Sequence, residues 1–332
     1  MKELINKITS EFGPAGNEEK IREFIQEQIE DKVDDIYTDN LGNLIAKIKG
    51  TGNGKKIMLA AHMDQIGLMV THIDDDGFLR FTNIGGVNSN ILVGKSVIFS
   101  DGTKGTIGIE KYDDIKNLKM SKLYIDIGVA SKEEAQKKVS IGDSAVYAPN
   151  FNDNGERITS TYQDDRIGCY VLVDTIEKLA KSETPHELYF VFTAQEEVGA
   201  RGAKTAAFHI EPDIGIAVDV TGTGDTPEAP TMDVSLGEGT AIKVKDSGSI
   251  THPWIKELLV STAEEHSINY QLEVLEYGGT DAMTIHTTKG GIPSGTVSIP
   301  CRYIHTPGET VDLNDVRASV DLLTKLLENE IE

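Results

Sequence analysis

Two adjacent carboxylates, Glu196 and Glu197, follow the apolar run at residues 189–193. A buried strand that ends just before this pair places both acids at one edge of a sheet. One carboxylate can then bind a metal ion while the other stays free as a general base, an arrangement that dinuclear hydrolases need. Adjacent acids after a strand are also common on ordinary surfaces. The pair alone therefore does not separate a catalytic turn from a solvated one.

Four more positions carry ligand-type side chains at the ends of predicted elements. Residues 56–61, 213–218 and 294–299 are short apolar runs that predict buried strands, and apolar residues recur at helical spacing after residue 163. The side chains that follow these strands or open this helix are His62, Asp219, His305 and Asp164. In open α/β sheets, ligands collect beyond the carboxyl ends of the strands. We therefore expect these residues to meet the glutamate pair at one sheet edge.

The number of candidate ligands fits two metal ions better than one. Two imidazoles and three carboxylates exceed the three protein ligands that one catalytic zinc usually takes. If one carboxylate bridges, each ion has three protein ligands, and ions about 3.5–4 Å apart can share an activated water. Asp64 follows His62 closely, and its carboxylate or carbonyl oxygen is expected to fix the second imidazole nitrogen.

Each position also has an ordinary explanation when taken alone. His62 fits a core histidine. Asp164 and Asp165 fit an N-cap and a first-turn charge favoured by the helix dipole. Asp219 fits a turn residue, and His305 fits a loop made rigid by Pro307. Only their joint occurrence favours a metal site.

At these residues the chain resembles the dinuclear metallo-aminopeptidases that include glutamyl aminopeptidase, deblocking aminopeptidase and the tetrahedral aminopeptidases. Some relatives are known as cellulase M. The order and spacing of the motifs carry the resemblance, which extends over essentially the whole chain. The matching segments are residues 61–64, 164–166, 193–199, 218–219, 278–282 and 302–307.

The resemblance implies two divalent metal ions per subunit, zinc or cobalt, together with their ligands. Asp164 would bridge the two ions, a choice over Asp165 that rests on motif alignment. The other ligands would be His62 and Asp219 for one ion, and Glu197 and His305 for the second.

The catalytic residues that the resemblance implies are Glu196 and Asp64. Glu196 would take a proton from the bridging water and pass it to the leaving amine. A metal-bound hydroxide would attack the scissile carbonyl while one ion stabilises the oxyanion. Asp64 would contact the ligand residues without binding a metal ion itself. The chain departs from many relatives at Gln65, where an acid is common.

The composition narrows the class of protein. The chain has 332 residues, 26% of them charged, and a net charge of −22. The length favours two domains, and the charged fraction is typical of a globular protein. The acidity argues against nucleic-acid and anionic-membrane partners. The start lacks a signal-peptide core, and no apolar run approaches the roughly 18 residues of a membrane span. The chain has only two cysteines, Cys169 and Cys301. We expect both to be free thiols that pack in the core of a cytoplasmic protein.

Short alternating strands between about residues 69 and 155 interrupt the α/β pattern. We expect an α/β protein whose mixed-sheet catalytic domain, residues 1–68 and 156–332, has helices on both faces. An inserted β-barrel-like domain would occupy residues 69–155, and the resemblance implies that it makes subunit contacts in a homo-oligomer, a dodecamer. Asn17 is the expected N-cap of an early helix.

The leading hypothesis is a metal-dependent aminopeptidase that acts on short peptides. Another two-metal amide hydrolase, such as a deacylase or deblocking enzyme, uses the same ligands, and the sequence separates these poorly. A glucanase is disfavoured because no pair of free carboxylates is left to flank a sugar. A purely structural zinc site is disfavoured because it leaves Glu196 unexplained. Acidic, hydrophobic and broad N-terminal preferences all stay open.

Overall fold

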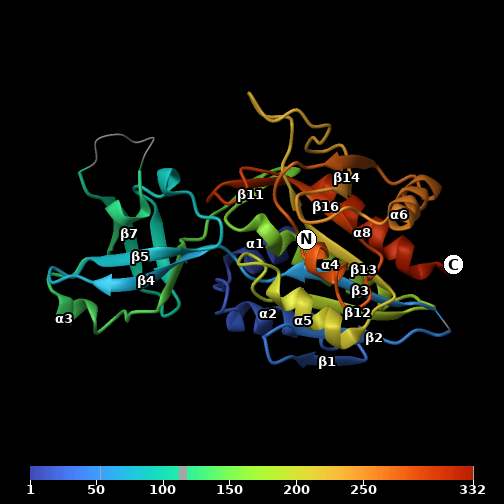
Figure 1. The fold of residues 1–332 in the computed structure, drawn as a ribbon, viewed down its shortest axis with the longest axis horizontal. Helices are drawn as coiled ribbons and strands as arrows, with labels where there is room; N and C mark the ends of the chain where they lie inside the picture. Colours follow the sequence, from blue (N-terminus) through green and yellow to red (C-terminus); the bar gives the residue numbers. More distant parts are fainter. Residues whose placement is uncertain (53, 112–117, 332) are drawn as a thin grey trace.

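A computed structural model describes residues 1–52, 54–111 and 118–331 of the chain. Figure 1 shows two units of different size, a larger α/β unit and a smaller unit built of strands. Both chain ends lie in the larger unit. The smaller unit interrupts the larger one in sequence, because its strands lie between Gly67 and Tyr147.

Eleven strands form one mixed sheet in the described part of the chain. Along the sheet they are β1 (Asp35–Thr38), β2 (Leu44–Ile48), β12 (Glu187–Thr193), β3 (Lys56–His62), β13 (Ile214–Thr221), β16 (Ser294–Arg302), β17 (Glu309–Asp312), β11 (Arg157–Ser160) and β10 (Phe151–Asn154). Off this path, β14 (Thr240–Lys245) pairs with β16, and β15 (Tyr270–Val274) pairs with β14. The central strands β12, β3, β13 and β16 run parallel, so their carboxyl ends share one edge.

The central strands are mostly apolar because helices cover both of their faces. Every residue of β13 is buried, the pattern that parallel strands show when neither face meets water. Along β3, Ile57 and Leu59 join one core cluster while Met58 and Ala60 join another, as alternation along a strand requires. The predicted fold class, with helices on both faces of a mixed sheet, is confirmed.

Two groups of helices make these two layers. On the first face, α4 (Gln163–Leu179) contacts β3 and β13, and α8 (Leu313–Glu328) contacts α4 and β16. On the second face, α5 (Arg201–Ile210) contacts β12 and β3, and α7 (Ala282–Ile285) contacts β13. The remaining α-helices of the larger unit are α1 (Lys2–Ser10), α2 (Glu19–Ile29) and α6 (Pro253–Glu265).

The smaller unit is a closed antiparallel barrel. Its strands follow the order β4 (Gly67–Ile73), β5 (Leu79–Ile84), β8 (Leu123–Asp126), β7 (Lys104–Ile109), β6 (Ser96–Phe99) and β9 (Ser144–Tyr147). Short helical turns η1 (Ser89–Ile91), η3 (Met120–Lys122) and α3 (Lys132–Ala135) connect them. The barrel has its own apolar core, which includes Leu79, Val97 and Ile125. The predicted β-barrel-like unit is therefore present.

The early helix begins later than the sequence suggested. Glu18, not Asn17, occupies the N-cap of α2, and no side-chain cap closes this end. Instead, the Glu18 carboxylate accepts the backbone N–H of Gly16 at 2.7 Å and that of Gln195 at 3.2 Å. The predicted cap was wrong because a long-range contact near the sheet edge competes with local capping. Among the helices that the structure describes, none has the length and apolar content to cross a membrane.

Candidate metal centre and active site

The parallel strands bring the candidate ligands to one sheet edge. His62 is the last residue of β3, and Asp219 lies near the end of β13. Glu196 and Glu197 follow the end of β12, and His305 follows the end of β16. Asp164 comes from the first turn of α4, where the backbone departs from helical geometry and the Asp164–Asp165 peptide is cis.

Asp164 stands between the two histidines. Its Oδ1 lies 3.1 Å from Nε2 of His62, and its Oδ2 lies 3.2 Å from Nε2 of His305. Among the residues that the structure describes, ligand-type atoms form two groups, and within each group they lie within 4.8 Å of one another. The first group is His62, Asp164 and Asp219, and the second is Asp164, Glu197 and His305. Asp164 is thus the residue that the two groups share.

Glu196 belongs to neither ligand group but lies close to both. Its Oε2 is 4.0 Å from Nε2 of His62, and its side chain is only 12% exposed. It lines the same cavity as His62, Asp164 and His305. A carboxylate in this place can reach a water that lies between the two groups without being a ligand of either.

Burial and crowding shift the pKa values of the site strongly. Burial raises the pKa of Glu196 and of Asp219 well above its ordinary range, and neighbouring carboxylates add to the effect. Burial acts on Asp164 in the same direction, yet hydrogen bonds with His305 and His62 hold its pKa low. Burial disfavours the charged form of His305, but Asp164 and Glu197 raise its pKa to about 12. These shifts record a surplus of buried negative charge.

The residues present fit divalent metal ions. Nitrogen and carboxylate donors together suit zinc, cobalt or manganese, and cations offset the buried negative charge. Among the described residues, Oε1 of Glu197 is buried without a hydrogen-bond partner. A buried carboxylate oxygen without a partner is costly, and a metal ion would supply the missing contact.

Three side chains hold the backbone of the turn that carries the two glutamates. The N–H of Ala194 donates to Asn43 at 2.9 Å, and that of Gln195 donates to Glu18 at 3.2 Å. Asp64 accepts from the N–H groups of the next two residues, Glu196 at 2.8 Å and Glu197 at 3.1 Å. All three of these side chains are buried. Four consecutive N–H groups are therefore fixed before any ligand binds.

Two more buried acids hold the other ligands by their backbone. Glu309 accepts the N–H of Asp164 at 2.9 Å and the N–H of His305 at 2.7 Å. Asp165 accepts the N–H of His62 at 3.2 Å. The carboxylate of Asp165 thus holds the backbone of a ligand residue, whereas the carboxylate of Asp164 faces both imidazoles. Sequence reasoning missed Glu309, although it lies only four residues after His305.

His62 is oriented by the backbone of Asp64. Its Nδ1 lies 3.0 Å from the carbonyl oxygen of Asp64 and 3.7 Å from the nearer carboxylate oxygen. The carbonyl therefore fixes the imidazole and leaves Nε2 for the metal group. The Asp64 carboxylate instead serves the glutamate turn. Glu18 and Asn43 gave no local signal in the sequence, because their contacts join residues 177 and 151 positions apart.

A cavity of about 850 Å³ opens at the sheet edge, with Glu196 and both ligand groups in its lining. Its remaining wall is largely neutral and includes Thr221, Leu275, Tyr277 and Met283. Two cationic residues also line the cavity, but Lys243 is buried and paired with Glu273, and Arg302 is paired with Asp225. The cavity is large enough for a side chain and adjoining backbone of a peptide.

The barrel reaches the ligands through two glycines, Gly85 and Gly86. A Cβ atom on Gly86 would lie 2.6 Å from Nδ1 of His305, and one on Gly85 would lie 3.1 Å from Oε2 of Glu197. Contacts this short leave no room for a side chain. The barrel therefore packs directly against the group that contains Glu197 and His305.

Comparison with known proteins defines the class as a metal-dependent aminopeptidase. Residues 42–322 match the M42 glutamyl aminopeptidase model, and the chain belongs to that family. An aminopeptidase homologue from Acetivibrio thermocellus is 54% identical over 328 residues, which cover 98% of each chain. The predicted family is confirmed.

Solved structures agree with this assignment. The aminopeptidase APDkam598 from the archaeon Desulfurococcus kamchatkensis is 41% identical with a TM-score of 0.94, over 98% of this chain and 94% of its own. The TET1 peptidase of Pyrococcus horikoshii, which can assemble into a tetrahedron or a large octahedral shell, is 36% identical with a TM-score of 0.88, over 98% of each chain.

Proposed function

We propose that this aminopeptidase removes N-terminal residues from short peptides with two divalent metal ions per subunit, zinc or cobalt. The observation that carries the proposal is the position of Asp164, whose two oxygens lie 3.1 Å from His62 and 3.2 Å from His305. A carboxylate that offers one oxygen to each of two ligand groups is suited to bridge two ions. In two-metal hydrolases the ions lie about 3.5–4 Å apart.

The remaining ligands divide between the two ions. His62 and Asp219 would hold the first, and Glu197 and His305 the second. When bound, such ions polarise the scissile carbonyl and lower the pKa of a water between them. The carboxylates around the cavity also offer acceptors for the free α-amine of a peptide.

Glu196 acts as the general base in this proposal. Its mostly buried carboxylate lines the cavity and lies 4.0 Å from Nε2 of His62, so it can accept a proton from a water held at this edge. It takes a proton from the attacking water and delivers it to the leaving amine. Asp64 accepts the backbone N–H of Glu196 at 2.8 Å, which fixes the backbone from which this carboxylate projects.

Metal analysis of purified protein tests the two-ion site. We expect two ions per chain by elemental mass spectrometry after loading with zinc or cobalt. Asp164→Asn should lose both ions together, with at least about tenfold weaker affinity, whereas Asp76→Asn on the exposed barrel surface should keep them. A ratio of one ion per chain, or full occupancy in Asp164→Asn, would contradict the proposal.

Matched peptides separate an aminopeptidase from a deblocking enzyme or deacylase. One peptide has a free N-terminus, and the second is acetylated there. We expect cleavage of the free peptide only. Cleavage of the acetylated peptide would favour the deblocking alternative, because that reaction does not need a free amine.

We further propose that residues 69–155 form an inserted domain that contacts other subunits in a cytoplasmic homo-oligomer, a dodecamer. A solved PhTET1 structure, which is a dodecamer, supports the assembly, and the buried free cysteines Cys169 and Cys301 suit a reducing compartment. Light scattering of the purified protein tests it. A monomer at micromolar concentration would rule out the assembly.

A further inference from the structure

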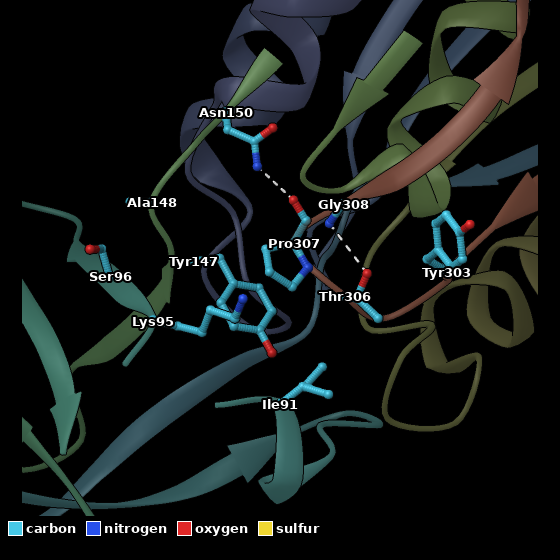
Figure 2. A pocket seen from close by; sticks show the side chains of 10 residues that line it. All are labelled: Ile91, Lys95, Ser96, Tyr147, Ala148, Asn150, Tyr303, Thr306, Pro307 and Gly308. Atoms are coloured by element: carbon cyan, nitrogen blue, oxygen red, sulfur yellow. Dashed lines mark hydrogen bonds between the residues drawn. The ribbon is translucent and has the colours of Figure 1, made fainter. Parts of the chain in front are cut away.

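A second cavity, of about 610 Å³, adjoins the active-site cavity. Figure 2 shows its lining, in which Thr306 and Pro307 lie between Tyr303 and Tyr147. Tyr303 lines both cavities and is 55% exposed, so it stands on a rim that they share. The ligand-type groups do not extend into this second cavity.

The same two chain segments border both cavities. On the barrel side, Gly86 lines the active-site cavity and Ile91 lines the second one. On the opposite side, His305 lines the active-site cavity and Thr306 lines the second. A peptide whose N-terminal residue lies at the ligand groups therefore has a bordered path that leads past Tyr303.

The wall of the second cavity is firmly held. The side-chain amide of Asn150 donates to the carbonyl of Pro307 at 2.6 Å, which ties the His305 loop to the segment that leaves the barrel. Tyr147 is only 6% exposed, and its hydroxyl has no hydrogen-bond partner among the described residues. Burial raises the pKa of Tyr147 to about 12, so the hydroxyl keeps its proton and remains a donor.

The charge of this cavity is opposite to that of the chain. Lys95 is the one charged residue among the described residues that line it, whereas the whole chain carries a net charge of −22. Ile91, Ala148 and Pro307 make most of the remaining surface apolar. A lone ammonium beside apolar side chains suits a carboxylate attached to an apolar chain.

We propose that the second cavity binds the C-terminal end of peptide substrates, with the Lys95 ammonium taking their free carboxylate. The inference rests on the proposed function, because an enzyme that holds the N-terminal residue at the metal ligands must direct the rest of the peptide away from them. Lys95 is then a specificity residue for short peptides with a free C-terminus. It takes no part in the chemical step.

Peptides of two to six residues, each made as the free acid and as the C-terminal amide, test this subsite in the full assembly. For peptides long enough to reach Lys95, we expect amidation to raise KM roughly two- to fivefold, the size of an exposed charge pair, with kcat unchanged. Lys95→Met should abolish the difference between acid and amide. Lys104→Met, on the same barrel but outside both cavities, should retain it.

A blocking variant gives a second measurement that does not depend on charge. Ala148→Trp should raise KM for the longer peptides and leave hydrolysis of a single aminoacyl p-nitroanilide unchanged. Equal KM values for acid and amide at every length in the unsubstituted enzyme would overturn the subsite, as would an intact difference in Lys95→Met. A change of assembly size in Lys95→Met would also overturn it, because Lys95 would then belong to a subunit contact. Failure of the unsubstituted enzyme to cut the aminoacyl p-nitroanilide would instead contradict the proposed function.

Discussion

The carboxylate of Asp64 accepts the backbone N–H of Glu196 at 2.8 Å. Its second oxygen accepts the N–H of Glu197 at 3.1 Å, so one buried acid holds the backbone of both glutamates. Asp64 therefore positions both the proposed general base, Glu196, and a proposed metal ligand, Glu197. It lies two residues after His62, which is another proposed ligand. This arrangement couples the ends of β3 and β12.

Asp64→Ala is expected to damage the turn rather than the ligands. It leaves two partly buried N–H groups without acceptors, at about 1–3 kcal/mol each. The free energy of unfolding should fall by roughly 2–6 kcal/mol, and kcat should fall because Glu196 moves. Asp64→Asn keeps one acceptor oxygen. Its free energy of unfolding and its kcat should therefore lie between those of Asp64→Ala and those of the unsubstituted enzyme. Denaturation and steady-state kinetics measure this order; equal effects of the two substitutions would contradict it.

Glu196→Gln separates proton transfer from metal binding. The amide cannot accept a proton, so we expect kcat to fall by roughly 10²- to 10⁴-fold, the usual contribution of a general base. Metal content and unfolding midpoint should stay unchanged, because Glu196 belongs to neither ligand group. Glu197→Gln provides the comparison, since it should lose affinity for one ion. Kinetics and metal analysis on the same preparations decide; retained turnover in Glu196→Gln would remove it from this role.

The sequence predicted the strands better than the contacts behind the ligands. Apolar runs that end in His62 or lead to His305 are local patterns, and parallel strands necessarily bring such ends together. The supports of these ligands are long-range instead. Glu18 contacts Gln195 and Asn43 contacts Ala194 over more than 150 positions of sequence, and no local spacing encodes such pairs. The same competition displaced the predicted cap at Asn17.

Gly86→Ala is expected to disturb one half of the metal site. The added Cβ would lie 2.6 Å from Nδ1 of His305, and Gly86 has no positive φ that would add backbone strain. The ring must therefore move, which should weaken the ion held by Glu197 and His305 more than the other. Gly290→Ala is the matched control, because its Cβ meets no atom within 4 Å.

Cobalt titration followed by absorption spectroscopy resolves the two ions in Gly86→Ala. We expect one tight ion and one that binds at least about tenfold more weakly, with a lower kcat. Gly290→Ala should bind both ions as the unsubstituted enzyme does. Equal weakening of both ions would show that the substitution acts on the whole fold and not on His305.

Asp315 gives the fold a pH dependence that is separate from the active site. Its carboxylate accepts the N–H groups of Gly237 and Gly239, each at 2.8 Å, and burial raises its pKa to about 7. In the unfolded chain an aspartate titrates near pH 4. Between about pH 4 and 7 the folded state therefore retains a proton that the unfolded state has released. Stability from this group is highest at low pH and is lost as the pH rises through that window.

Asp315→Asn removes this titration and should flatten the dependence. Between pH 5 and 8, the unsubstituted protein should lose roughly 1–3 kcal/mol more of its unfolding free energy than Asp315→Asn does, because each pKa unit corresponds to about 1.4 kcal/mol. Asp321→Asn, exposed on the same helix, should follow the unsubstituted protein. Urea denaturation at both pH values measures the difference, and parallel curves for Asp315→Asn and the unsubstituted protein would exclude a raised pKa at Asp315.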